Sequence, residues 1–205
     1  MSDEPGPKLA PGQLYRIAWV FYLILAIVGV VWIGLDERPA GPCAGGGICS
    51  ALFVQPTLWP LDLLLGLGTA LVVIVAWELV RRVVPLAQRL EEQLARMVGD
   101  LGTDEALAIA LVSGFSEELF FRGAVQGSLG WPIATALFAL MHTGSGRALR
   151  LWTVYAAVAG LVFAGLTEWR KNLLPAIVAH VAINAFGLWR LSRSTAAGET
   201  PPEAA

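Results

Sequence analysis

The sequence predicts an all-α protein: a polytopic membrane helix bundle of about six transmembrane helices plus a cytoplasmic amphipathic helix. Of the 205 residues, 56% are hydrophobic and only 15% are charged, and the mean hydropathy is +0.65. Soluble domains carry about 25% charged residues. The apolar residues gather in runs near the ~20 residues that a helix needs to cross a bilayer. The net charge of −2 provides no basic surface, so the lipid bilayer is an expected partner and nucleic acid is not.

The apolar runs give six candidate spans within a predicted transmembrane domain, 14–193. They are 14–35, 61–80, 106–125, 131–142, 151–169 and 173–191. The fourth is short and runs into a Thr-Gly-Ser-Gly segment, so we expect it to end inside protein or beside a watery cavity, because lipid cannot satisfy open backbone groups. Most tryptophans lie near span ends and are expected to be interfacial anchors: Trp32, Trp59, Trp77, Trp131, Trp152, Trp169 and Trp189.

The segments outside the spans differ in character. The polar tails, 1–13 and 194–205, are predicted to be disordered. Loop 36–60 is expected to be extracytoplasmic, and its two cysteines, Cys43 and Cys49, are candidates for a disulfide. Segment 85–99 has leucines and charges at helical spacing, which predicts either an amphipathic helix on the cytoplasmic surface or a solvated connector helix.

Basic residues near the span ends predict the orientation. Those expected to mark cytoplasmic loops are Arg81, Arg82, Arg89, Arg96, Arg147, Arg150, Arg190 and Arg193. Both termini then face the cytoplasm, and we expect an integral protein of a prokaryotic inner membrane. Arg170 and Lys171, between spans five and six, violate the pattern.

The third span contains three charged residues, Glu117, Glu118 and Arg122, and the only two histidines, His142 and His180, also lie in apolar segments. An ionised group in hydrocarbon costs about 2.5–3.5 kcal/mol on insertion scales, so such residues mark functional or paired sites by default. The sequence therefore predicts a reactive centre within the membrane.

Helical geometry separates the two glutamates. Glu118 and Arg122 are four residues apart on one helix face and can form a charge-assisted pair, whereas Glu117 points about 100° away. At about 1.5 Å per residue, Glu117, His142 and His180 lie roughly 14, 16 and 10 Å from the extracytoplasmic ends of their spans, so they can meet in one layer. Asn184 follows His180 by one turn and could complete an oxyanion cradle.

The order of these residues resembles the three motifs of the CPBP family, also called Abi, which includes the type II CAAX prenyl endopeptidases and bacteriocin-processing proteins. The motif residues are Glu117-Glu118-x-x-x-Arg122, Phe138-x-x-x-His142 and His180-x-x-x-Asn184. The resemblance covers 106–191, the expected protease core. The first two spans carry no motif of the family.

The resemblance implies a glutamate-type intramembrane endopeptidase that needs no cofactor and cleaves a membrane-associated protein or peptide, either prenylated or unprenylated. Glu117, helped by His142, would activate a water molecule for attack on a peptide carbonyl. His180 and Asn184 would stabilise the oxyanion. Glu118 and Arg122 would support the helix and the local field.

Three other readings stay open. In a zinc protease, Glu117, His142 and His180 would bind Zn²⁺ with water in the fourth position, although the sequence has no H-E-x-x-H motif. A non-enzymatic immunity or scaffold protein could keep the same fold. A transporter would be expected to show internal repeats, and none is apparent.

Overall fold

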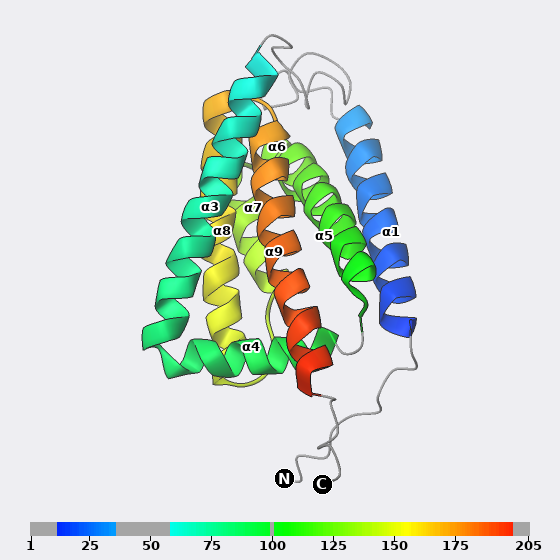
Figure 1. The fold of residues 1–205 in the computed structure, drawn as a ribbon. Coiled ribbons are helices and arrows are strands. Elements are labelled where there is room, and N and C mark those ends of the chain that lie inside the picture. Colours follow the sequence, from blue (N-terminus) through cyan, green and yellow to red (C-terminus); the bar gives the residue numbers. More distant parts are fainter. Residues whose placement is uncertain (1–11, 36–57, 99–100, 199–205) are drawn as a thin grey trace, which may run out of the picture.

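The computed structural model describes residues 12–35, 58–98 and 101–198, the last five by their backbone alone. These ranges are helical and contain no strand, which confirms the all-α prediction (Figure 1). The helices are α1 (Gln13–Leu35), α3 (Trp59–Val83), α4 (Pro85–Val98), α5 (Thr103–Glu117), the π-helix η2 (Glu118–Gln126), α6 (Gly127–Leu129), α7 (Trp131–Met141), α8 (Arg147–Arg170) and α9 (Leu174–Gly198).

Four helices are long and apolar enough to cross a membrane: α1, α3, α8 and the part of α9 from Leu174 to Arg193. Large apolar side chains are exposed along α1 and α3, as expected for helices that face lipid. The other two predicted spans have a different character. The third is an interior helix that changes from α to π and back, and the fourth is the short α7. The chain is thus a polytopic membrane bundle, with four long apolar helices among the described residues.

Two helices extend a few residues beyond the predicted bounds of the segments next to them. Loop 36–60 was expected to reach Pro60, but α3 begins at Trp59 and takes the proline into its first turn, where a missing N–H costs nothing. The tail predicted from residue 194 begins with helix, because α9 continues to Gly198. Cys43 and Cys49 lie outside the described residues, so their disulfide remains a prediction.

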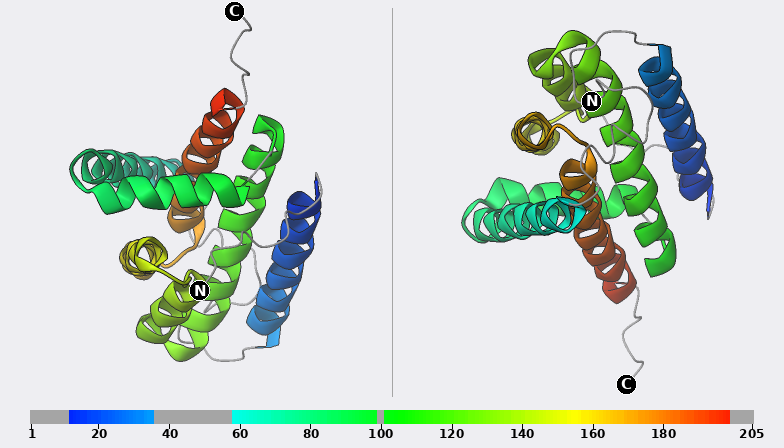
Figure 2. Two further views of the ribbon diagram at one scale, coloured as in Figure 1. Left: turned by 90° about the horizontal axis from the view of Figure 1, so that it is seen from below. Right: turned by 90° about the horizontal axis from the view of Figure 1, so that it is seen from above.

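Helix α9 lies at the centre of the bundle, packed against α3 and α5 (Figures 1 and 2). Two glycines allow this close packing. A Cβ atom on Gly66 of α3 would lie 2.7 Å from the Val178 side chain, and one on Gly114 of α5 would lie 2.8 Å from Val181. Small residues at helix contacts are what bring membrane helices together, so these glycines determine how near α9 comes to the buried charges of α5.

Helix α4 lies across one end of the bundle, transverse to the long helices (Figure 1). It packs against α8, α9 and α3 with Ala87 and Leu90 fully buried, while Arg89 and Glu92 on its other face are exposed. This burial pattern confirms an amphipathic helix over 85–98. The helix closes the end of the bundle at which α3 and α9 present Arg81, Arg82 and Arg190.

The two basic residues that violate the orientation pattern are both paired with carboxylates. Nε of Arg170 donates to Oδ1 of buried Asp62 over 2.6 Å, and Asn172 donates to Oδ2 of the same carboxylate over 2.9 Å. Lys171 pairs with Glu168 over 2.8 Å. Neither side chain presents an uncompensated positive charge at this end of the bundle.

Candidate active site

The buried carboxylates occur where the third predicted span changes its helical geometry. Glu117 is the last residue of α5 and Glu118 opens the π-helix η2, without a break in the backbone. Glu117 is 6% exposed, while Glu118 and Arg122 are completely buried. Short π-helical insertions occur frequently at functional sites, because they turn side chains away from the regular α spacing. Here the change begins at the glutamate pair.

The buried guanidinium group of Arg122 makes hydrogen bonds and aromatic contacts. Its NH1 donates to Oε1 of Glu118 over 3.1 Å and its NH2 to the carbonyl oxygen of Gly160 over 3.2 Å. The guanidinium carbon lies 4.3 Å from the ring centroid of Phe138 and 5.3 Å from that of Phe163. Cation–π contacts of this kind are strongest when desolvated. The expected Glu118–Arg122 pair is therefore present, and it links η2 to α7 and α8.

His180 contacts the same carboxylate as Arg122. Its Nδ1 lies 2.7 Å from Oε1 of Glu118, and its ring stacks on Phe163 with a centroid separation of 4.9 Å. Because the ionised carboxylate only accepts hydrogen bonds, Nδ1 carries the proton. In the neutral imidazole the other nitrogen, Nε2, is then an unprotonated acceptor.

His142, immediately after α7, is fixed in the same way. Its Nδ1 lies 2.8 Å from the backbone oxygen of Phe138, and a carbonyl oxygen only accepts. Trp152 packs edge-on against the imidazole at 5.3 Å between centroids, so this tryptophan lines the site. The Nε2 of His142 is therefore also an acceptor in the neutral ring.

Both histidines direct Nε2 towards one oxygen of Glu117. Oε2 of Glu117 is 3.8 Å from Nε2 of His142 and 3.9 Å from Nε2 of His180. These separations exceed direct hydrogen-bond distance and suit a bridging water. Among the described residues this oxygen has no hydrogen-bond partner. One carboxylate oxygen and two imidazole nitrogens thus surround a single point.

Two hydroxyl groups complete the polar part of the site. Nδ2 of Asn184 donates to Oγ of Ser113 over 3.0 Å, and Ser113 is itself buried. Tyr22, from α1, lines the same cavity as Ser113 and Glu117 and interacts with both. Asn184 is thus near Glu117, but one of its amide hydrogens is already used within the protein.

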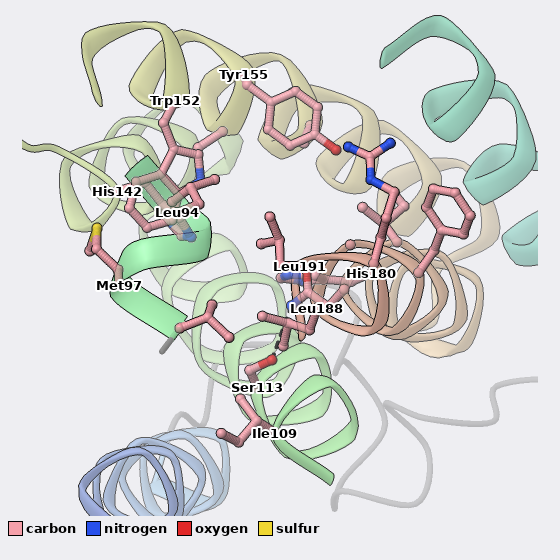
Figure 3. A pocket seen from close by; sticks show the side chains of 18 of the residues that line it. Leu94, Met97, Ile109, Ser113, His142, Trp152, Tyr155, His180, Leu188 and Leu191 are labelled. Atoms are coloured by element: carbon pink, nitrogen blue, oxygen red, sulfur yellow. Dashed lines mark hydrogen bonds between the residues drawn. The ribbon is translucent and has the colours of Figure 1, made fainter. Parts of the chain in front are cut away.

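These groups line a cavity of about 390 Å³ that is otherwise mostly apolar. Figure 3 shows Ser113 and His180 on neighbouring helices, with His142 and Trp152 across the opening from His180. The lining includes Glu117, Asn184 and Tyr22, and it continues to α4 through Leu94 and Met97. A cavity with apolar walls and a few convergent polar groups is the usual form of a binding or catalytic site.

The sequence identified most of these residues, but not all of their contacts. It placed Glu117, His142, His180 and Asn184 in one layer, and the structure places all four on one cavity. It did not identify Ser113 or Tyr22. Ser113 precedes Glu117 by one helical turn, which was a usable signal. A lone tyrosine in an apolar span gives no indication of which helix it faces.

The imidazole nitrogens and the Glu117 carboxylate are suitable zinc donors, but the distances between them do not suit a bound zinc ion. Imidazoles that bind metal usually donate their second N–H to a carboxylate or carbonyl, as both histidines do. Ligands of a tetrahedral zinc ion lie about 3.3 Å apart, whereas the oxygen-to-nitrogen distances are 3.8 and 3.9 Å. No group of three His, Cys, Asp or Glu residues arranged to hold a metal ion occurs in the described ranges.

Comparison with known proteins connects this geometry to one family. Residues 103–186 match the family model described as type II CAAX prenyl endopeptidase Rce1-like. A curated relative, uncharacterized protein YpbD of Bacillus subtilis (strain 168), is 35% identical over 79 residues, which are 38% of this chain and 40% of the relative. The alignment therefore spans less than half of either protein. No solved structure gives a significant match.

Proposed function

We propose that the protein is an intramembrane endopeptidase in which Glu117 activates water, on the premise that residues 103–186, which match the type II CAAX prenyl endopeptidase Rce1-like family model, share the activity of that family. One observation carries the proposal: Oε2 of Glu117 faces Nε2 of both His142 and His180 at 3.8 and 3.9 Å. All three residues lie within the matched segment and line the same cavity.

In the proposed reaction, a water molecule bound between Glu117 and His142 donates its hydrogens to Oε2 and Nε2. Its oxygen then attacks the carbonyl carbon of the scissile peptide, and the proton taken up by the carboxylate passes to the nitrogen of the departing amine. This step requires the base to lie within hydrogen-bond distance of its water, either already in the free protein or after a small movement on substrate binding.

The oxyanion is stabilised by Asn184 and His180. Asn184 has a second amide hydrogen beyond the one donated to Ser113. His180 donates through Nε2 only when both ring nitrogens are protonated, and the Glu118 carboxylate, 2.7 Å from Nδ1, is the counter-ion for that form. Donors preorganised in a water-poor site stabilise such a charge far better than they would in bulk water.

The substrate class proposed is a membrane-associated protein or peptide. A mostly apolar cavity that contains the site within the bundle suits an extended, apolar segment or a lipid-modified one. We further propose that both termini face the cytoplasm, on the side of α4, because the basic residues Arg82, Arg89 and Arg96 are exposed at that end.

Zinc-dependent proteolysis is the second candidate, and the tautomers of His142 and His180 are the observation that favours it. With zinc bound by these histidines and Glu117, the metal would supply a more acidic water. Glu117, His142 and His180 would then serve as ligands rather than as base and oxyanion donors.

The test uses the detergent-purified protein with two sets of peptides, farnesylated CAAX peptides and unprenylated ones. We expect the wild type to cleave at least one set, and Glu117→Gln and His142→Ala to lose cleavage while keeping expression and melting temperature. Glu92→Gln, the same change at an exposed position on α4, is the matched control and should stay active. If only the unprenylated peptides are cleaved, CAAX processing is excluded as the function. If Glu117→Gln still cleaves peptides, the proposed mechanism is refuted.

A non-enzymatic immunity or scaffold role predicts a different outcome of the same assay. The wild type would then cleave neither set at any concentration, with all motif residues intact. That result would leave the membrane bundle in place and reject the endopeptidase proposal.

A further inference from the structure

The geometry points to Tyr22 as a positioning residue for Glu117: its hydroxyl holds one carboxylate oxygen and thereby directs the other towards the two histidines. This inference rests on the proposed function, since it concerns the carboxylate that activates water. Tyr22 lies on α1, outside the family segment 103–186. The site would then be completed by a part of the chain that the family comparison does not cover.

Helix α1 is docked closely enough to bring Tyr22 to this site. A Cβ on Gly29 would lie 3.2 Å from the backbone of Phe120, and one on Gly123 would lie 2.7 Å from the side chain of Ile33. Gly29 is two helical turns beyond Tyr22, on the same face of α1. The glycine contacts fix the separation of α1 from η2, and the same face of α1 carries the tyrosine into the cavity.

The hydroxyl of Tyr22 connects the two functional parts of the site. It lines the cavity together with Glu117 and Ser113 and interacts with both side chains, and Oγ of Ser113 accepts from Asn184. Because Oε2 of Glu117 has no hydrogen-bond partner among the described residues, the interaction with Tyr22 is assigned to Oε1. The tyrosine therefore relates the position of the proposed base to that of the proposed oxyanion donor.

A carboxylate needs such an anchor in this position. The other ionisable groups that face it are His142 from α7 and His180 from α9, both beyond direct hydrogen-bond distance, while the neighbouring Arg122 is bonded to Glu118 and Gly160. Without the tyrosine hydroxyl, rotation of the carboxylate about its last side-chain bond would move Oε2 away from both imidazoles. Small misplacements of a reacting group cost large factors in rate.

The experiment compares Tyr22→Phe with Tyr15→Phe. Both changes remove one hydroxyl from α1, but Tyr15 contacts Trp19 and is not part of the cavity lining. For Tyr22→Phe we expect kcat to fall by about 10- to 100-fold, the usual worth of a hydrogen bond to a charged group, with KM and the melting temperature close to wild type. Tyr15→Phe should keep wild-type kcat and KM.

The outcomes separate this inference from the proposed function. If the wild type cleaves the peptide and Tyr22→Phe has the same kcat, the role of Tyr22 is overturned and the endopeptidase proposal stays intact. A change in KM alone would also overturn it, because the hydroxyl would then act on substrate binding. Equal losses in both tyrosine variants would indicate a general defect of α1 and reject the assignment. A wild type that cleaves nothing would reject both.

Discussion

Nδ1 of His180 lies 2.7 Å from Oε1 of Glu118, so the second glutamate of the buried pair orients a histidine as well as an arginine. The same oxygen receives NH1 of Arg122 at 3.1 Å. This shared carboxylate explains why the site needs two adjacent glutamates. Glu117 presents an oxygen to the cavity, whereas Glu118 is fully buried and fixes the ring that faces it.

Glu118→Gln should lower kcat by about 10- to 100-fold, because the amide is neutral and a hydrogen bond to a charged group contributes about 1.5–3 kcal/mol. The substitution keeps the size of the side chain, so KM should change little. Steady-state kinetics on the cleaved peptide would measure both values. Wild-type kcat in this variant would mean that His180 does not depend on Glu118 for its role.

Arg122→Met should destabilise the fold by about 3–5 kcal/mol, because it leaves the Glu118 carboxylate charged, buried and without its main counter-ion. The melting temperature in detergent would report this loss. The double variant Arg122→Met with Glu118→Gln removes both charges and should regain much of the stability. A double variant as unstable as Arg122→Met would instead assign the effect to lost contacts with Phe138 and Gly160.

Asp62→Asn should weaken the link between the start of α3 and the turn between α8 and α9 by about 1–3 kcal/mol. Asp62 is 3% exposed and bonds both Arg170 and Asn172. Lys171→Gln is the matched control, since the Lys171–Glu168 pair is 62% and 41% exposed and such pairs contribute about 0–1 kcal/mol. Equal melting temperatures for the two variants would contradict the assignment.

Gly66→Ala should cost about 1–3 kcal/mol, the usual effect of overpacking. Its Cβ would lie 2.7 Å from Val178 and 2.8 Å from the backbone oxygen of Pro175, and backbone cannot easily move. Gly68→Ala, half a turn away with nothing within 4 Å, should be neutral or slightly stabilising. Thermal unfolding of the two variants side by side would measure the difference.

Chelators should leave proteolysis unchanged if Glu117 acts without a metal. Treatment with 1,10-phenanthroline, followed by metal analysis of the active protein, would measure this. Loss of activity that zinc restores would favour the zinc mechanism, in which Glu117, His142 and His180 act as ligands. The wide separations of 3.8 and 3.9 Å lead us to expect retained activity.

The fold class was predictable because backbone polar groups cannot bond to hydrocarbon, which limits a membrane-spanning chain to helices or closed barrels. Helix α1 agrees with its predicted span almost to the residue. The buried pair was also predictable, since spacing of four residues places Glu118 beside Arg122 in either form of helix. The π-helix was not, because it depends on how η2 packs against α1 and α7 rather than on local preference.

The sequence by itself determined that this chain is a helical membrane protein with charged residues inside its apolar segments, and it identified Glu117, the two histidines and the asparagine that line the cavity. Those conclusions follow from the high cost of charge in lipid and from the period of a helix. The tertiary structure alone decided which partner each histidine has: Glu118 for His180 and the Phe138 carbonyl for His142. Such pairings depend on the rotation and separation of whole helices, which close contacts such as those of Gly29 and Gly114 fix.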